Sequence, residues 1–318
     1  MPEEELELET VSCNLCGRPE SETLYDLPDR LLFRHEVRAH LVCCRQCGLI
    51  YQNPRPVLQV MARYYPAEYD LYAPEPDGAK TSWLLRQAYR YGMEKRRRFV
   101  TAHKRAGRLL DVGCATGLFL RTMQSLPGWE VYGVEISPHA AGIARGTYHL
   151  NVTEGTLESS HYSEDFFDVV TMWDVFEHLH DPAQSLKEIF RILRPDGILV
   201  LRVPNGGGWD ARLFRSYWAG LEPPRHLYVF TSQTLQAVLE RNRFEVIRRT
   251  TMSGAYTTFL LSLKFWLRDR LGARADQVVN MFYHPFWRLA AAPIFTLTSL
   301  GLRGPLLVVT ARKKASYA

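Results

Sequence analysis

Short apolar runs alternate through the middle of the chain with longer stretches whose hydrophobic residues recur at helical spacing. Apolar runs bounded by turn residues are typical of strands buried in a parallel sheet. Their alternation with helical patterns predicts an α/β fold. The predicted strands lie within Leu109–Val112, Trp129–Ile136, Asn151–Leu157, Asp168–Met172, Ile198–Val203, Phe244–Thr250 and Pro305–Arg312.

The helical stretches begin at capping residues. Ser137 and Asp181 each stand directly before a proline, the arrangement of an N-cap followed by proline at the first helical position. Upstream, Thr81–Lys104 is predicted to form one helix, and we expect its basic run Lys95–Arg98 to be a solvent-exposed face.

A long insert, Thr251–Gly304, separates the last two predicted strands. Its two apolar runs are shorter than the ~20 residues that a membrane-spanning helix needs. Its aromatic residues, leucines and excess of basic over acidic residues suit helices that lie on a membrane surface. The alternative is a helical cap that closes the acceptor pocket or forms a dimer face.

A glycine-rich turn follows the first predicted strand. Gly113 and Gly117 lie between the strand that ends near Asp111 and a helix that starts at Leu118. Glycine allows a sharp turn and close approach of a ligand to the backbone. A strand, a glycine turn and a helix N-terminus together predict a nucleotide-type ligand site. Glu135 ends the next strand, at the spacing of a residue that binds ribose hydroxyls.

The sequence resembles the class I S-adenosylmethionine-dependent methyltransferases. The resemblance rests on the acidic residue followed by G-x-x-x-G at 111–117, and above all on the run WDVFEHLHDPAQSLKEIFRILRPDGILVLRVPN. It implies a Rossmann-like seven-stranded sheet, mostly parallel with the last strand antiparallel, and helices on both faces. One departure from the family pattern is Ala115 in place of a common glycine.

The resemblance also implies S-adenosylmethionine as cofactor. Glu135 is expected at the ribose, and Thr156 and Leu157 at the adenine. The full set of residues expected to line the cofactor site is Asp111, Gly113, Gly117, Glu135, Ile136, Thr156, Leu157, Trp173 and Asp174.

Two cysteine pairs near the N-terminus, CNLCG and CRQCG, have the spacing of a four-thiolate zinc site. The predicted ligands are Cys13, Cys16, Cys44 and Cys47, and Cys43 is the spare cysteine. Four thiolates complete the coordination shell, so a structural zinc is expected. The alternatives are a redox dithiol and buried cysteines without a metal.

Two histidines are candidate catalytic residues. Asp174, Glu177 and His178 follow the fourth predicted strand at the ligand-binding edge of the sheet. Three roles are open for Glu177 and His178: they transfer a proton, help to hold a metal, or only shape the pocket by hydrogen bonding. His226 lies in a P-x-H run that is common in related sequences and is the stronger candidate for a general base. Its alternative role is to bridge two loops.

Composition narrows the class of protein. The 318 residues are 46% hydrophobic and 23% charged, as in ordinary globular proteins, and the net charge of +5 does not by itself indicate nucleic-acid binding. The acidic start MPEEELELET is unlike a signal peptide, and clustered cysteines favour a reducing compartment. We therefore expect a cytoplasmic enzyme, with membrane association at the inner face as an open question.

The predicted function is methyl transfer to a small molecule or a saccharide, including a lipid-linked one, with O-methylation favoured. One alternative is an rRNA or tRNA methyltransferase whose zinc ribbon binds RNA. Against it, no Asn/Asp-Pro-Pro-Tyr run follows the fourth strand. Another alternative is a non-catalytic scaffold, which the intact glycine turn and Glu135 argue against. The sequence does not indicate an oligomeric state.

Five segments are predicted. Tyr64, Tyr65, Tyr69 and Tyr72 of the second segment form either a lid over the site or packing between domains. The segments are a zinc-ribbon-like module (1–57), a linker and helix that act as a lid (58–105), the cofactor-binding core (106–250), the helical insert (251–304), and the last core strand with the tail (305–318).

Overall fold

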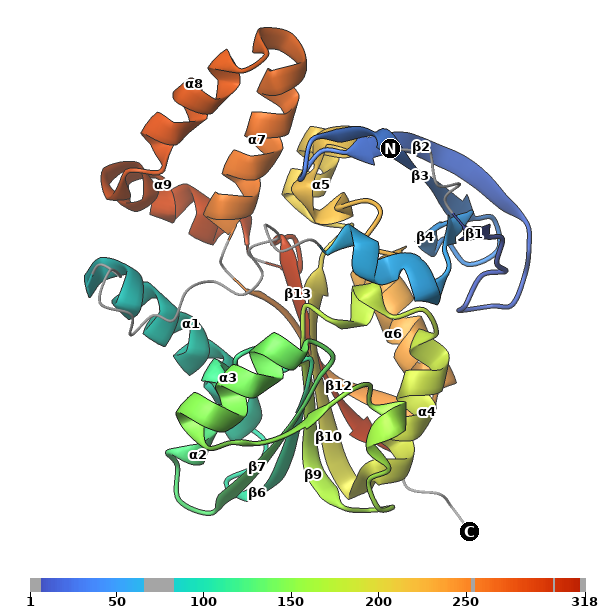
Figure 1. Cartoon of the computed structure of the whole chain (residues 1–318), viewed down its shortest axis with the longest axis vertical. Helices are drawn as coiled ribbons and strands as arrows, with labels where there is room; N and C mark the ends of the chain where they lie inside the picture. The colour runs from blue at the N-terminus through green and yellow to red at the C-terminus, as the bar shows by residue number, and fades with distance from the viewer. Residues whose placement is uncertain (1–6, 66–82, 253–254, 300, 315–318) are drawn as a thin grey trace.

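A seven-stranded sheet forms the centre of the computed structural model, which describes residues 7–65, 83–252, 255–299 and 301–314 (Figure 1). The strand order is β12-β13-β10-β9-β6-β7-β8. β13 runs antiparallel to both neighbours, and the other neighbouring strands are parallel. The strands are β6 (Gly107–Val112), β7 (Trp129–Glu135), β8 (Asn151–Glu154), β9 (Phe167–Trp173), β10 (Leu193–Pro204), β12 (Phe244–Met252) and β13 (Leu306–Lys313).

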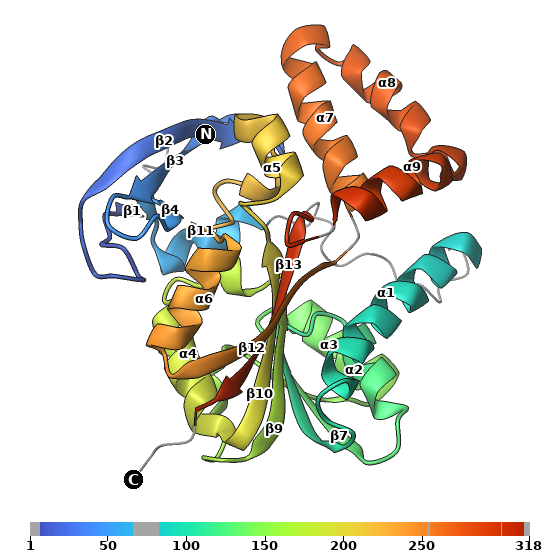
Figure 2. The same cartoon turned by 180° about the vertical axis from the view of Figure 1, so that it is seen from behind.

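Helices cover both faces of this sheet (Figures 1 and 2). On one face, α1 (Trp83–Thr101), α2 (Leu118–Gln124) and α3 (Pro138–Tyr148) share a hydrophobic core with the strands. On the other face, α4 (Pro182–Ile192) and α6 (Ser232–Arg241) do the same. Strands buried on both sides need apolar residues at successive positions, which explains their continuous apolar runs. The predicted fold class is confirmed.

The helix caps form as the sequence predicts. The Ser137 hydroxyl accepts a hydrogen bond from the amide of Ala140, and the Asp181 carboxylate accepts one from the amide of Gln184. A capping box at Thr231 begins α6. Each side chain satisfies an amide that the helix itself leaves unpaired. These caps fix where the helices begin relative to the edge of the sheet.

The N-terminal module is a small antiparallel sheet with a short extra ladder. β2 and β3 form a long hairpin, β4 follows on β3, and β1 pairs with β5. The strands are β1 (Leu8–Glu9), β2 (Ser21–Asp29), β3 (Arg34–Cys44), β4 (Ile50–Gln52) and β5 (Arg55–Pro56).

The module's sheet has a strand from the distant part of the chain. β11 (Tyr228–Val229) pairs antiparallel with β4, so the order is β11-β4-β3-β2. Buried residues of the module, including Leu15 and Tyr51, belong to the same hydrophobic cluster as α4 and α6. The sheet therefore crosses the predicted boundary at residue 57, and that boundary stays a prediction.

The insert forms three helices, α7 (Ala255–Leu271), α8 (Arg274–Phe282) and α9 (Pro285–Thr298), which lie beyond the end of the sheet where β13 begins (Figures 1 and 2). Among the described residues, no helix combines the length and the apolar character needed to cross a bilayer.

Short elements complete the described chain. They are the α-helix α5 (Trp209–Phe214) and the 3₁₀ helices η1 (Leu58–Tyr64), η2 (Glu158–Ser160), η3 (Phe176–His178), η4 (Arg215–Tyr217) and η5 (Ala219–Leu221).

Two tyrosines of the predicted lid, Tyr69 and Tyr72, lie outside the described residues.

Candidate functional site

The two glycines of the turn after β6 both adopt left-handed backbone conformations. Gly113 has φ of 69° and Gly117 has φ of 82°. A Cβ added at Gly113 would lie 2.5 Å from a methyl of Val175, and one at Gly117 would lie 2.4 Å from a methyl of Leu150. Both glycines are therefore required by backbone conformation and by space. Ala115, which departs from the family pattern, also has a positive φ of 49°.

Asp111, the second-last residue of β6, is a buried acid. The hydroxyl of Thr171 on β9 donates a hydrogen bond of 2.5 Å to its carboxylate. Burial raises the pKa of Asp111 to about 7, although this hydrogen bond and the charge of Arg96 oppose the rise. The side chain is 3% exposed. The hydrogen bond between Asp111 and Thr171 therefore links β6 to β9 just before the glycine turn.

Glu135 ends β7 next to that turn. Its carboxylate oxygens accept hydrogen bonds of 2.8 Å from the amides of Ala115 and Ser137. Burial raises the pKa of Glu135, and the backbone amides of Ser137 and Ala115 partly offset this. The next residue, Ile136, is 69% exposed although it is aliphatic. A fixed carboxylate beside an open aliphatic side chain fits the ribose and adenine of an adenosyl cofactor.

The remaining predicted cofactor residues occupy two places at this edge. Leu157 is buried, and Thr156 exchanges hydrogen bonds with Ser159 in the turn after β8. Trp173, at the end of β9, is 6% exposed, and its indole N–H has no hydrogen-bond partner among the described residues. A buried donor of this kind is costly unless a ligand or water accepts from it, which also fits a bound cofactor.

Asp174 forms an ion-paired cluster that the sequence did not indicate. Arg202 on β10 donates to both carboxylate oxygens, and the guanidinium of Arg96 lies 3.8 Å from one of them. Arg96 also lies over the ring of Trp173, 5.3 Å from its centroid. Burial opposes the charge on Asp174, but Arg202 and Arg96 outweigh it and lower its pKa.

The expectation that the whole run Lys95–Arg98 faces solvent is therefore wrong for Arg96. The Arg98 side chain is 71% exposed, whereas that of Arg96 is only 20% exposed and points at Asp174. Consecutive residues on a helix point in different directions, so one member of a basic run can face the site. The sequence could have shown that Arg96 points in a different direction from its neighbours on the helix. It could not have shown that Asp174 lies in that direction.

His178 is held by its Nδ1 atom. That atom lies 3.0 Å from the carbonyl oxygen of Arg225 and 3.0 Å from the hydroxyl of Tyr65. Because a carbonyl only accepts, Nδ1 carries the proton and Nε2 keeps its lone pair. Burial lowers the pKa of His178 to about 3, and the electrostatic effect of the nearby His226 is the second cause. His178 is therefore a neutral imidazole at physiological pH.

His226 is oriented in the same way. Its Nδ1 lies 2.9 Å from the carbonyl oxygen of Gly220, so Nδ1 is the donor in this hydrogen bond. Nε2 lies 3.8 Å from a carboxylate oxygen of Glu222. The rings of His178 and His226 meet edge to face with centroids 4.6 Å apart. The structure thus brings together the two histidines that the sequence proposed.

Glu177 completes this cluster as a buried acid. It is 1% exposed, and neither carboxylate oxygen has a hydrogen-bond partner among the described residues. Burial, and next the charge of Asp174, raise its pKa well above the usual range for glutamate. Glu177, His178 and His226 offer ligand atoms within 4.8 Å of one another, an arrangement that can hold a metal ion or relay a proton. Asp174 is outside this group because it pairs with Arg202.

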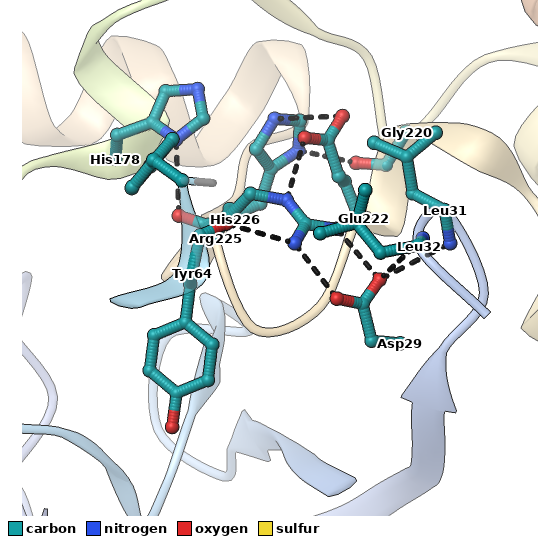
Figure 3. A network of polar contacts seen from close by, with 10 residues as sticks. Asp29, Leu31, Leu32, Tyr64, His178, Gly220, Glu222, Arg225 and His226 are labelled. Atoms are coloured by element: carbon teal, nitrogen blue, oxygen red, sulfur yellow. Dashed lines mark hydrogen bonds and ion pairs between the residues drawn. The ribbon is translucent and has the colours of Figure 1, made fainter. Parts of the chain in front are cut away.

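A second network lies next to the histidines (Figure 3). The guanidinium of Arg225 makes a bidentate ion pair with Asp29 of β2, at 2.8 and 2.7 Å, and both side chains have no solvent exposure. The Arg225 Nε also donates to Glu222 at 3.1 Å. No sequence signal linked these positions, because Asp29 and Arg225 lie far apart in the chain.

The four predicted zinc ligands lie together at the base of the N-terminal hairpin. The sulfur atoms of Cys13 and Cys47 are 3.4 Å apart, and those of Cys16 and Cys44 are 3.5 Å apart. All four sulfurs lie within 4.8 Å of one another, an arrangement that can hold a metal ion. Cys43 is adjacent but is not part of this group. Four clustered thiols from two C-x-x-C pairs fit tetrahedral zinc.

Comparisons with known proteins agree with this geometry. Ubiquinone biosynthesis O-methyltransferase of Aromatoleum aromaticum is 29% identical over 167 residues, which cover 50% of this chain and 68% of that protein. Demethylmenaquinone methyltransferase of Chlorobaculum parvum is 32% identical over 102 residues, 32% of this chain and 42% of that protein. The match thus spans less than half of the Chlorobaculum protein, and the substrates in these names belong to those proteins.

A solved structure shares the fold. Phosphoethanolamine N-methyltransferase 2 of Haemonchus contortus, in complex with S-adenosyl-L-methionine, superposes with a TM-score of 0.52 at 16% identity, covering 84% of this chain and 63% of that one. The family described as "Methyltransferase domain" matches residues 84–249, more than half of the chain. With its sheet order and glycine turn, the chain therefore belongs to this methyltransferase family and is a class I S-adenosylmethionine-dependent methyltransferase.

Proposed function

We propose that the enzyme methylates a hydroxyl group of a small molecule and that His226 is the general base. The observation that carries the proposal is the hydrogen bond from His226 Nδ1 to the Gly220 carbonyl. It leaves Nε2 as the ring nitrogen that can take a hydroxyl proton in the neutral form of the imidazole. The cofactor supplies an electrophilic methyl group when it is bound.

The cofactor residues are proposed from their places at the sheet edge. Glu135 would accept hydrogen bonds from the ribose hydroxyls, and Ile136 and Leu157 would contact the adenine, with Thr156 at its rim. Trp173 and Asp174 would face the part of the cofactor near the reacting methyl. Asp111, Gly113 and Gly117 would shape the turn, because added side-chain atoms at the glycines clash with their surroundings. Alignment of acceptor and cofactor supplies the rest of the rate enhancement.

The hydroxyl is the favoured acceptor group because one relative carries the name of an O-methyltransferase. The names of two relatives refer to quinones, which supports a small-molecule acceptor here. The alternative acceptor is the hydroxyl group of a saccharide, including a saccharide linked to a lipid. An acceptor that must lose a proton during attack needs a base, and this requirement matches His226.

The four cysteines are proposed to hold a structural zinc. Each C-x-x-C pair contributes two sulfurs, so four protein ligands close the coordination shell and leave no position for substrate. The module is small and has a limited core of its own, so the metal would stabilise its fold.

The surface of α9 is proposed to contact a lipid bilayer. Several of its large apolar side chains are exposed, Leu289 by 75%, Leu297 by 68% and Ile294 by 63%. No acidic residue follows Asp276 in the sequence, whereas Arg288 lies within α9. An apolar helix face with only basic charge suits the surface of an anionic membrane. An acceptor of low polarity would be concentrated in such a bilayer.

Labelling of a cell extract tests the reaction. Purified enzyme and S-adenosylmethionine with a labelled methyl group would be incubated with extract separated into small-molecule, lipid and RNA fractions. We expect label, with a mass increase of one methylene, on a hydroxyl of a small molecule or lipid, and no label with the Gly113→Val variant. Label only in RNA would overturn the proposal in favour of the nucleic-acid alternative.

A further inference from the structure

A fully buried ion pair, Asp29–Arg225, links the N-terminal module to the catalytic core (Figure 3). Asp29 is the last residue of β2, and its Oδ1 also accepts hydrogen bonds from the amides of Leu31 and Leu32. The hairpin of the module therefore fixes the direction of this carboxylate. A planar guanidinium bound through two parallel hydrogen bonds is oriented as well as attracted.

Arg225 in turn contacts both histidines of the candidate site. Its backbone carbonyl accepts from His178 Nδ1, and it directly precedes His226 in the chain. Its Nε donates to Glu222, whose other carboxylate oxygen faces His226. Its guanidinium also donates to the carbonyl oxygen of Tyr64. One residue thus connects the module to the groups around both imidazoles, through its side chain and its backbone carbonyl.

The chain that follows His226 is a strand of the module. The carbonyl of Leu227 accepts from the amide of Gln52 at 2.9 Å, and Tyr228 and Val229 pair with β4. β4 begins just beyond Cys47, the last cysteine of the four. The loop of His226 is therefore held by the module on both sides, through Arg225 before it and β11 after it.

We propose that the N-terminal module positions the catalytic base and that Arg225 is the positioning residue. A buried ion pair is weak evidence of added stability, because apolar residues of similar size often stabilise as well. Its best-supported use is to specify one arrangement, and here that arrangement is the path of the loop from Glu222 to Phe230. Metal bound to the four cysteines would hold the base of the module's hairpin and, through β4, the same loop.

The test replaces the pair by apolar residues, Asp29→Leu with Arg225→Met, which avoids leaving one buried charge alone. The matched control is Glu245→Leu with Arg312→Met, an exposed ion pair between β12 and β13. Amide hydrogen exchange would be followed in residues 220–230 and in the cofactor turn at 109–120. Calorimetry would give the affinity for S-adenosylmethionine.

We expect exchange in residues 220–230 to rise by about tenfold or more in the apolar pair variant. Exchange at 109–120 and cofactor affinity should stay within about twofold of wild type, as they should in the control. Removal of metal with a chelator should also raise exchange at 220–230. Unchanged exchange there in the folded variant would overturn the proposal, as would an equal rise at 109–120, which a general loss of structure would cause.

If the apolar pair variant does not fold, Arg225→Lys decides. It keeps the charge but loses the bidentate geometry, so we expect the same local rise in exchange, and none would refute the role of Arg225. The inference rests on the proposed role of His226, but exchange and calorimetry need no acceptor, so its failure is separate from that of the methylation proposal. With an acceptor in hand, kcat should fall by up to about 10²-fold with the cofactor KM unchanged, and Arg225→Lys should retain more activity than Arg225→Met.

Discussion

The imidazole rings of His178 and His226 lie edge to face, with their centroids 4.6 Å apart. Each ring donates from Nδ1 to a backbone carbonyl, of Arg225 in one case and Gly220 in the other. In each ring Nδ1 is thereby the donor, which leaves Nε2 as the nitrogen that can take up a proton. Protonation of both rings would place two positive charges side by side. The pair is therefore suited to accept one proton at a time.

His226→Ala should lower kcat by about 10²–10⁴-fold, the usual contribution of a positioned general base. The affinity for S-adenosylmethionine should change little, because His226 is not expected to contact the cofactor. The kcat–pH profile should also lose its acidic limb, since a protonated imidazole cannot accept a proton. Steady-state kinetics with the acceptor identified by labelling, together with calorimetry, measure these effects.

His178→Ala is the matched control and should affect binding more than turnover. If His178→Ala loses kcat while His226→Ala keeps it, the two roles are reversed. If both variants turn over at the wild-type rate, no histidine base is needed, and alignment alone carries the reaction.

The contribution of His178 to folding stability should fall as the pH decreases from about 6.5 toward about 3. The pKa of His178 is lowered to about 3 in the folded protein from an ordinary value of 6.5. Between these values the unfolded state binds the proton and the folded state does not, so acid favours unfolding. One such group gives a slope of at most about 1.4 kcal/mol per pH unit.

Denaturant unfolding at a series of pH values would measure this slope. His178→Asn should flatten it, whereas replacement of the exposed His139 by Asn should not. Glu177 acts in the opposite direction, because its raised pKa favours the folded state at low pH and this contribution is lost as the pH rises. The difference between wild type and His178→Asn isolates the histidine. Parallel curves for the two would contradict the prediction.

Glu135→Ala should weaken S-adenosylmethionine binding by about 1–3 kcal/mol, the range for losing hydrogen bonds to a charged acceptor. Calorimetry measures the change directly. Glu130→Ala is the matched control, because Glu130 lies on the same strand with its side chain 57% exposed. Equal affinities for Glu135→Ala and wild type would remove Glu135 from the cofactor site.

The features that the sequence predicted are those with local causes. A cap such as Ser137 or Asp181 acts on amides within one turn, and a glycine turn needs only its own backbone. The central strands could be predicted because they carry continuous apolar runs and alternate with helices. Likewise, each C-x-x-C pair is a local unit, and the structure adds only that the two pairs meet.

The features that the sequence could not predict depend on distant pairs. Nothing near Asp29 indicates that its partner is Arg225, because the pairing arises when the module packs on the core. The same packing makes β11 a strand of the module's sheet. Arg96 lies in a run of basic residues that looks solvent-exposed, and only the position of α1 shows that it faces Asp174. The domain boundaries and the cytoplasmic location stay predictions.

Purified protein should contain about one zinc per chain, as a single four-thiolate site requires. Cys16→Ser should lower the metal content and destabilise the N-terminal module, because the metal contributes to its folding. Cys43→Ser is a sharp control, since Cys43 is adjacent to the ligand Cys44 but outside the group of four. Elemental analysis of reduced protein decides. A metal-free wild-type protein, or an equal loss in Cys43→Ser, would refute the ligand assignment.

The apolar surface of α9 should bind anionic vesicles. Leu289 and Ile294 are 75% and 63% exposed, and transfer of one leucine side chain out of water is worth about 1.5–3 kcal/mol. Leu289→Glu should therefore weaken binding to phosphatidylglycerol vesicles by about tenfold or more, measured by co-sedimentation. Leu58→Glu is the control, because Leu58 is 60% exposed but lies on η1, outside the insert. Binding should also weaken with salt, since Arg288 contributes an electrostatic attraction. The membrane proposal fails if the wild-type protein does not bind vesicles. If light scattering then shows that Leu289→Glu converts a dimer into a monomer, α9 is a contact between copies of the chain.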